Sequence, residues 1–177
     1  MRIMVIGVSA GAGKSTFARK LGEALDLSVY HLDCYYWKPD WVEASSEEFA
    51  QAQADIVSSK SSWIIEGNYT GTFDIRVEHA DAIIYLELPL YVCLYRVVKR
   101  WITNQGKTRP DRADGCTEKL DWKFIHFIYT TYYPRKRKMR ERFREYEKDK
   151  QVIILKNRRE IDSYIRKVQK SKRVVAP

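Results

Sequence analysis

Apolar and polar residues alternate along the chain in two different periods. Short apolar runs without a helical period predict five buried strands, at about 3–6, 27–32, 62–65, 82–88 and 151–155. Between these runs, apolar residues recur at helical spacing and predict helices over about 14–25, 45–59, 73–79, 90–102 and 160–168. Strands that alternate with helices predict an α/β fold, in which a five-stranded parallel sheet carries helices on both faces.

Two further segments precede the last predicted strand. Residues 120–133 are apolar and aromatic almost all round, which predicts a buried helix that Pro134 bends or ends. Residues 134–150 carry charges of both signs at spacings of three and four, which predicts a solvent-exposed helix.

The first predicted strand leads into a glycine-rich loop, residues 7–16, with the sequence GVSAGAGKST. Glycines let the backbone curl so that several amide N–H groups point into one concavity, at the positive end of the next helix. A polyphosphate fits there, with Lys14 reaching the β- and γ-phosphates and Ser15 completing a magnesium shell. The predicted ATP-binding residues are Gly11, Ala12, Gly13, Lys14, Ser15 and Thr16.

The loop departs from the motif G-x-x-x-x-G-K-[ST] at one position, because Val8 stands where the motif has its first glycine. Two explanations are open. Either Val8 tolerates the turn, or the loop is one residue longer and Gly7 and Gly11 supply the freedom.

Other candidate residues follow the predicted strands, at the edge where α/β sheets bind ligands. Asp33 follows the second strand as either a functional acid or a turn residue. The aromatic segment 34–44 either walls a pocket or only covers the sheet edge. The candidate substrate-binding residues are Asp33, Trp37, Glu66, Asn68, Tyr69 and Arg76.

A polar segment at about 106–118 is predicted to form a flap. Arg109 and Arg112 lie three residues apart in it, and Arg100 lies on the predicted helix that leads into it. One interpretation is a surface loop with two exposed arginines. The other is a lid that closes over ATP and brings the arginines against phosphate oxygens.

The length of 177 residues fits a single domain over 1–177. A formal net charge of +9 favours polyanionic ligands, which include nucleotides, nucleic acids and membrane surfaces.

No apolar run approaches the roughly 18 residues of a membrane span, and the first residues lack a secretion signal. Three cysteines without metal-binding spacing favour reduced thiols. We therefore expect a cytoplasmic monomer or homodimer that does not contact a membrane.

Several segments together carry a resemblance: VIGVSAGAGKSTFARKL, HLDCYYWKPDW, WIIEGNY, the ELP after the fourth strand, and RPDRADGC. They resemble the bacterial topology modulation proteins, which look like small relatives of adenylate kinase. The resemblance spans essentially the whole chain and implies a P-loop NTPase fold with a small lid and an ATP site. It also implies that Glu66 is the Walker B acid, a magnesium ligand beside Ser15. Residues 66–68 depart from the Asp-Gly-aromatic-Pro pattern of adenylate kinases, so the acceptor is not identified.

Two function classes follow. The first is an ATP- and Mg²⁺-dependent kinase, similar to nucleoside monophosphate kinases, that phosphorylates a small and possibly nucleotide acceptor. Asp33 would then act either as the base or as a ligand of magnesium-bound water. The alternative is a nucleotide-dependent DNA-binding protein that affects DNA topology through the basic run 135–138, although acidic neighbours weaken that reading. The predicted catalytic residues are Lys14, Asp33, Arg100, Arg109 and Arg112.

Overall fold

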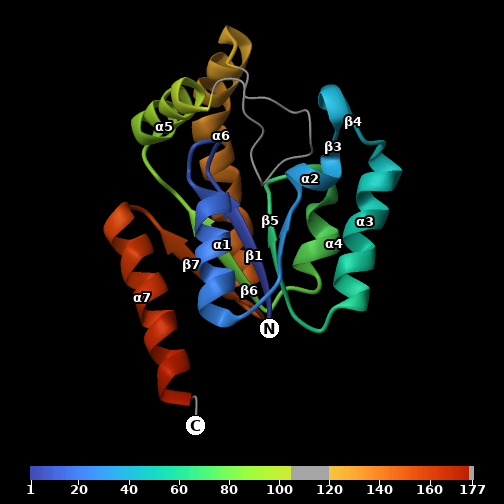
Figure 1. Ribbon diagram of the computed structural model, residues 1–177, viewed down its shortest axis with the longest axis vertical. Coiled ribbons are helices and arrows are strands. Elements are labelled where there is room, and N and C mark those ends of the chain that lie inside the picture. The colour runs from blue at the N-terminus through green and yellow to red at the C-terminus, as the bar shows by residue number, and fades with distance from the viewer. Residues whose placement is uncertain (105–119, 176–177) are drawn as a thin grey trace.

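Five parallel strands form the central sheet of the computed structural model, which describes residues 1–104 and 120–175 (Figure 1). The strand order is β2-β5-β1-β6-β7, and each neighbouring pair is parallel. The strands are β1 (Arg2–Gly7), β2 (Val29–His31), β5 (Trp63–Glu66), β6 (Ala82–Leu86) and β7 (Gln151–Leu155). The five-stranded parallel sheet predicted from the sequence is confirmed.

Helices cover both faces of this sheet, again as predicted. They are α1 (Lys14–Leu25), α2 (Asp33–Tyr36), α3 (Ser46–Ser59), α4 (Phe73–Val77), α5 (Leu90–Thr103), α6 (Trp122–Tyr146) and α7 (Arg158–Val175). Helices α1 and α7 pack together on one face, and α4 and α6 lie on the other, with α3 against α4. Helix α5 stands beyond the carboxyl edge of the sheet, beside α6 (Figure 1).

Ser45 and Glu48 have the spacing of a capping box in the sequence, and the structure forms it at the start of α3. The Glu48 amide donates to Ser45 Oγ (3.1 Å), and the Ser45 amide donates to Glu48 Oε2 (3.0 Å). The segment after α2 was not predicted in detail. It forms a small antiparallel hairpin, β3 (Trp37–Lys38) and β4 (Val42–Glu43), around a short 3₁₀ turn (Pro39–Trp41).

The predictions for residues 120–150 were partly wrong. Residues 122–146 form one helix of 25 residues that continues through Pro134. The first half of that helix is also not buried all round, because α6 extends past the end of the sheet (Figure 1). Its exposed large side chains there are Trp122, Phe127, Tyr129 and Tyr133.

A stripe of buried side chains explains why the helix survives the proline. Ile128, Tyr132, Met139 and Phe143 are buried along one side of α6, before and after Pro134. Phe143 packs edge-to-face on Tyr85 of β6, and the Tyr132 hydroxyl donates to the Leu88 carbonyl (2.8 Å). Burial of such a stripe on both sides of the proline outweighs its local cost of roughly 3 kcal/mol.

The predicted flap at 106–118, with Arg109 and Arg112, lies outside the described residues. Within residues 1–104 and 120–175, no helix has both the length and the apolar character needed to cross a bilayer.

Candidate functional site

The glycine-rich loop connects β1 to α1 at the carboxyl edge of the sheet. Val8 tolerates the turn: its side chain is fully buried, its amide donates to the Leu86 carbonyl (3.0 Å), and its φ is not positive. Gly11 and Gly13 do adopt positive φ values, 78° and 90°. A side chain at Gly11 would also collide with the Cys93 carbonyl oxygen of α5. Of the two explanations, the structure therefore supports a loop of ordinary length in which valine is accepted.

Helix α1 begins directly at this loop, with Gly13 as its N-cap. No side chain caps the first turn, and no acidic residue lies in it. Among the described residues, no side chain therefore caps the amide N–H groups at this end of the helix, and Gly13, Lys14, Ser15 and Thr16 all line the cavity, as phosphate binding requires.

Lys14 extends from this first turn across the glycine-rich loop. A side chain at Gly7 would lie 3.0 Å from Lys14 Cγ, so this glycine makes room for the lysine's aliphatic part. Lys14 Nζ lies 3.9 Å from Glu66 Oε1, at the end of β5. The β1–β5 pairing therefore brings the predicted phosphate lysine to the predicted Walker B acid.

His31 is a site residue that sequence reasoning missed. Its Nδ1 lies 3.0 Å from Glu66 Oε2, because β2 and β5 pair in a register that sets His31 beside Glu66. The position of His31, two residues before Asp33 at the end of a predicted strand, was the available signal. Glu66 is thus held between a lysine and a histidine, although its side chain is almost fully buried.

Asp33 and Tyr69 meet at the next position along the edge. The Tyr69 hydroxyl donates a 2.7 Å hydrogen bond to Asp33 Oδ1. Burial and the neighbouring Asp33 carboxylate raise the pKa of Tyr69 well above its usual value, so the hydroxyl stays a donor. Asn68 accepts a 3.0 Å hydrogen bond from the Gly7 amide, which ties the end of β5 to the phosphate loop.

The aromatic segment after Asp33 lines the cavity, which answers the question left open by the sequence. Trp37 and Trp41 form an edge-to-face pair with ring centroids 5.1 Å apart, and both line the cavity. Trp41 has a φ of 64°, an uncommon conformation for a bulky residue. Glu43, on β4, completes this wall.

Arg76 does not reach the cavity. It is fully buried beneath the loop after β5, where its guanidinium donates to the carbonyls of Gly67 (2.8 Å) and Tyr69 (2.9 Å). Burial lowers the pKa of Arg76 to about 10, although the nearby Glu66 carboxylate partly opposes that shift. The predicted substrate ligand therefore supports the loop that carries Asn68 and Tyr69.

Helix α5 supplies cations above the phosphate loop. Arg96 donates from Nη1 to the Ala12 carbonyl (3.2 Å), and Arg100 lines the cavity one turn further on. Lys99, the residue before Arg100, is exposed and lies over the Tyr95 ring.

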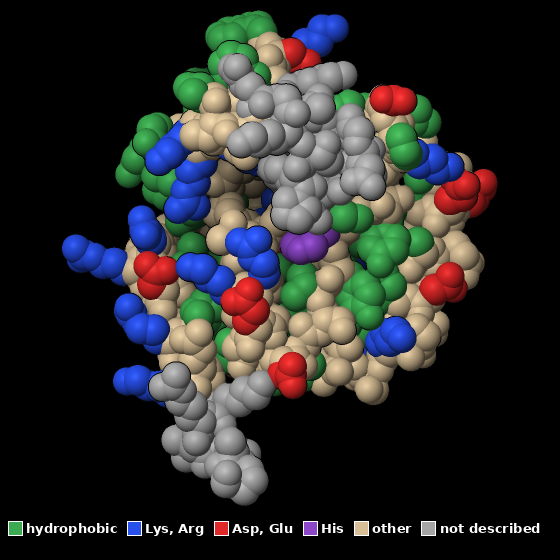
Figure 2. Space-filling view, in the orientation of Figure 1, with side chains coloured by type: hydrophobic (Ala, Val, Ile, Leu, Met, Phe, Trp, Pro, Cys, Tyr) green, Lys and Arg blue, Asp and Glu red, His purple; other side chains and the backbone are tan. Residues whose placement is uncertain are grey.

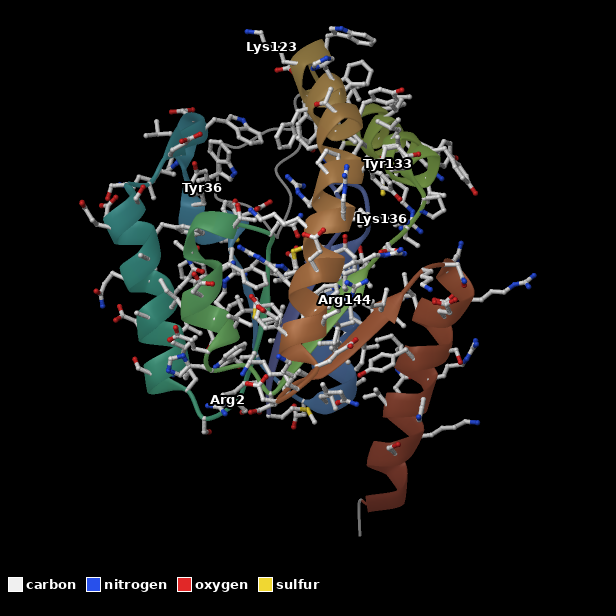
Figure 3. The ribbon with its side chains drawn as sticks, turned by 180° about the vertical axis from the view of Figure 1, so that it is seen from behind. Arg2, Tyr36, Lys123, Tyr133, Lys136 and Arg144 are labelled. Carbon is white, nitrogen blue, oxygen red and sulfur yellow. The ribbon has the colours of Figure 1, made fainter. Side chains whose placement is uncertain are left out.

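The basic run in α6 is divided among different roles. Arg135 lines the cavity and lies over the Phe127 ring, at 5.6 Å from its centroid. Lys136, near the middle of the helix in Figure 3, lies 3.2 Å from Glu87 Oε1. Arg137 and Lys138 are exposed. Of the four residues predicted to contact DNA, only Arg137 and Lys138 are thus exposed.

Together these residues enclose a cavity of about 1350 Å³ at the carboxyl edge of the sheet. It collects every described member of the predicted site except Arg76. Its lining includes Gly11, Ala12, Gly13, Lys14, Ser15, Thr16, Asp33, Trp37, Glu66, Asn68, Tyr69 and Arg100.

The donor atoms at this site fit Mg²⁺ bound together with a nucleotide. Ser15, Asp33 and Glu66 offer hard oxygen atoms, which Mg²⁺ prefers. In the part of the chain that is described, no cluster of three or more acidic, histidine or cysteine side chains could enclose a metal alone. This agrees with magnesium sites that rely on phosphates and water for most ligands.

Comparisons of the sequence with models of protein families give no match, and no curated protein matches it either. The resemblance to topology modulation proteins therefore stays a prediction.

Solved structures match over nearly the whole chain. A shikimate kinase from Bacteroides thetaiotaomicron has a TM-score of 0.56 and 17% identity, with 98% of each chain covered. A gluconokinase from Sinorhizobium meliloti 1021 has a TM-score of 0.53 and 14% identity, and 99% of this chain and 97% of that chain are covered. A shikimate kinase from Acinetobacter baumannii, solved with shikimate, has a TM-score of 0.51 and 14% identity, with coverage of 98% and 94%. These likenesses concern the fold: the chain has the P-loop NTPase fold that these kinases share.

Proposed function

We propose that the protein is an ATP-dependent kinase that transfers the γ-phosphate to a small acceptor bound beside Asp33. The observation that carries the proposal is that the phosphate loop and the Asp33–Tyr69 pair line one cavity, with Lys14 and Glu66 between them. A kinase needs this arrangement, because donor and acceptor must meet in one water-poor space.

Basic side chains around the loop support the phosphoryl-transfer role. Lys14 would hold the β- and γ-phosphates, and Arg96, Arg100 and Arg135 line the same cavity from α5 and α6. Positive groups fixed before the reaction stabilise charge that develops on the transferring group. Arg109 and Arg112 of the predicted lid would add to them on closure.

Acidic side chains have separate proposed roles. Ser15 and Glu66 would hold Mg²⁺, directly or through water, and His31 and Lys14 keep the Glu66 carboxylate in place. When bound, the ion supplies neutralising charge to the phosphates. Asp33, oriented by the Tyr69 hydroxyl, would position the acceptor.

ADP release by the purified protein tests the proposal. The panel contains nucleosides, nucleoside monophosphates, shikimate, gluconate and other hydroxyl compounds, with DNA as a separate arm. We expect release that depends on one acceptor and is lost in Lys14→Ala. Release that depends on DNA alone would contradict the kinase proposal and support the alternative, a nucleotide-dependent DNA-binding protein.

The exposed part of the basic run 135–138 gives a sharper test of the DNA-binding alternative. Arg137→Gln with Lys138→Gln leaves Arg135 in the cavity and Lys136 beside Glu87. We expect no change in acceptor-dependent turnover. A DNA-binding protein would instead lose affinity and show a salt dependence shallower by roughly one unit of slope per lost phosphate contact.

A further inference from the structure

The lysines and arginines that line the cavity lie on one side of it. In Figure 2, most of the basic side chains visible on this face lie over α1, α5 and α7, at the left. The basic lining residues belong to α1, α5, α6 and α7, and they are Lys14, Arg19, Lys20, Arg96, Arg100, Arg135 and Arg158. The other wall comes from residues 31–43 and 66–69. Of its described lining residues, none is a lysine or arginine, Asp33, Glu43 and Glu66 are acidic, and His31 lies beside Glu66. Two acidic residues, Asp121 and Asp162, also line the cavity on the basic side, where Asp162 Oδ2 lies 3.5 Å from Arg158 Nε.

Two cations close to this acidic wall are engaged elsewhere. Arg76 is buried below it and donates to the carbonyls of Gly67 and Tyr69. Lys38, on the same hairpin as Glu43, directs its Nζ to Glu48 Oε2, 2.8 Å away on the outer surface. Lys14 and His31 pair with Glu66, so the acidic charges left on this wall are those of Asp33 and Glu43. A phosphate or carboxylate bound beside these two would meet like charges, which is unfavourable.

The same wall offers aromatic surface. Trp37 and Trp41 line the cavity, and behind them Tyr36, Phe49 and Tyr69 form a connected cluster with ring centroids 4.7–5.1 Å apart. Tyr36 lies on the opposite side of the site from α5 and α6 (Figure 3). Flat or apolar ring faces, and cations in particular, bind well to aromatic rings of this kind.

From this segregation we propose that the acceptor carries no phosphate or carboxylate group. It is an uncharged or cationic hydroxyl compound with a flat or apolar ring face, bound against Trp37, Trp41 and Glu43. This inference rests on the proposed kinase activity and specifies its substrate class. It excludes nucleoside monophosphates, which the sequence alone left open as acceptors.

A hydroxyl acceptor also gives Asp33 a defined role. The acceptor oxygen forms a bond to the γ-phosphorus, and the bond from that phosphorus to the β–γ bridging oxygen breaks, releasing ADP. The hydroxyl proton passes to the Asp33 carboxylate, which the Tyr69 hydroxyl holds in position.

The experiment uses ATP whose γ-phosphate is labelled with heavy oxygen. The full-length protein is incubated with this ATP and a deproteinised cell extract, and labelled products are identified by mass. We expect the label in a product whose acceptor part has no acidic group. Label only in products of phosphorylated or carboxylated acceptors would overturn the proposed acceptor class and leave the kinase intact. Absence of any labelled small molecule would overturn both.

A charge reversal on the acidic wall tests whether this wall determines which acceptor the protein prefers. Glu43 is exposed and takes no part in phosphate binding, so Glu43→Lys should fold and bind ATP normally. We expect it to lower kcat/KM for the identified acceptor about tenfold, which corresponds to about 1.4 kcal/mol. Glu47→Lys makes the same charge change on α3, outside the cavity, and should leave kcat/KM unchanged. Equal effects of the two variants would contradict the proposal.

Discussion

The two walls of the cavity differ in how the chain builds them. One contiguous stretch, residues 7–16, forms the glycine-rich loop of the phosphate side, and its geometry follows from local backbone conformation at Gly11 and Gly13. The acceptor side combines the ends of β2 and β5 with a hairpin, so it exists only after the strands have paired. A local motif can be read from sequence, whereas a wall assembled from distant segments depends on register. The following variants test whether the two walls also have separate tasks.

Lys14→Ala should have the largest effect. In the proposed function the lysine holds the phosphates, and it is not part of the hydrophobic core, so we expect turnover to fall roughly 1000-fold, with little change in the melting temperature. Steady-state kinetics and thermal unfolding measure both. Lys60→Ala, an exposed lysine after α3, is the matched control. A folded Lys14→Ala protein with normal turnover would contradict the assignment of the phosphate side.

Asp33→Asn should lower turnover about 100-fold, because the amide cannot accept the acceptor's proton. Stopped-time assays at saturating ATP and acceptor measure kcat directly. Asp40→Asn provides the control: Asp40 is exposed with a φ of 60°, a conformation that asparagine also tolerates. If both variants lose turnover equally, Asp33 has no special role on the acceptor side.

Tyr69→Phe removes the hydroxyl that holds Asp33 and keeps the ring in the aromatic cluster. One hydrogen bond to a charged group is worth about 1.5–3 kcal/mol, so we expect at least about a tenfold loss in kcat. The KM for ATP should stay the same, because the tyrosine does not serve the phosphate side. Tyr91→Phe, at a position 74% exposed, is the control. A purely structural role would instead lower the melting temperature without changing kcat.

Glu87→Gln should have the smallest effect, on stability. Glu87 is buried just after β6, and it pairs with Lys136 and Arg140 of α6, the helix that carries the cavity residue Arg135. Burial alone would raise the pKa of Glu87, but hydrogen bonds from Arg140 and Lys136 outweigh it, and the pKa is lowered. We expect a loss of about 1 kcal/mol at neutral pH.

The pH dependence checks the sign of this effect. Because the folded-state pKa of Glu87 is lowered, its contribution is complete above the unfolded-state pKa of about 4.3 and is lost as pH falls through the folded-state value. The difference in unfolding free energy between wild type and variant should therefore shrink below about pH 4. A difference that persists unchanged in acid would show that the ion pairs do not cause it.

The sequence predicted what local chemistry controls. The Ser45–Glu48 capping box opens α3, and the glycines at 11 and 13 adopt the left-handed conformation that the loop requires. It did not predict the His31–Glu66 contact, because that contact depends on strand register. The sequence analysis predicted that Arg76 binds the substrate. In the structure Arg76 is buried and donates to backbone carbonyls, an arrangement that composition does not reveal.

Long-range packing accounts for the errors in α6. Local propensity at Pro134 argues for a helix end, but the buried stripe continues on both sides of the proline, and the Glu87 ion pairs hold the second half of α6 at the sheet. The composition of the first half of α6 also predicts burial, since large aromatic side chains are common in cores. Only the length of α6 relative to the sheet reveals that Trp122 and Tyr129 are exposed.

The division of the cavity into a phosphate wall and an acceptor wall is tested most directly by ATP affinity, measured by calorimetry at a fixed magnesium concentration. We expect Lys14→Ala to weaken ATP binding at least about tenfold, a loss of about 1.4 kcal/mol. Asp33→Asn and Glu43→Lys should bind ATP as tightly as the wild type. An equal loss of ATP affinity in Asp33→Asn and Lys14→Ala, or unchanged affinity in Lys14→Ala, would contradict the division.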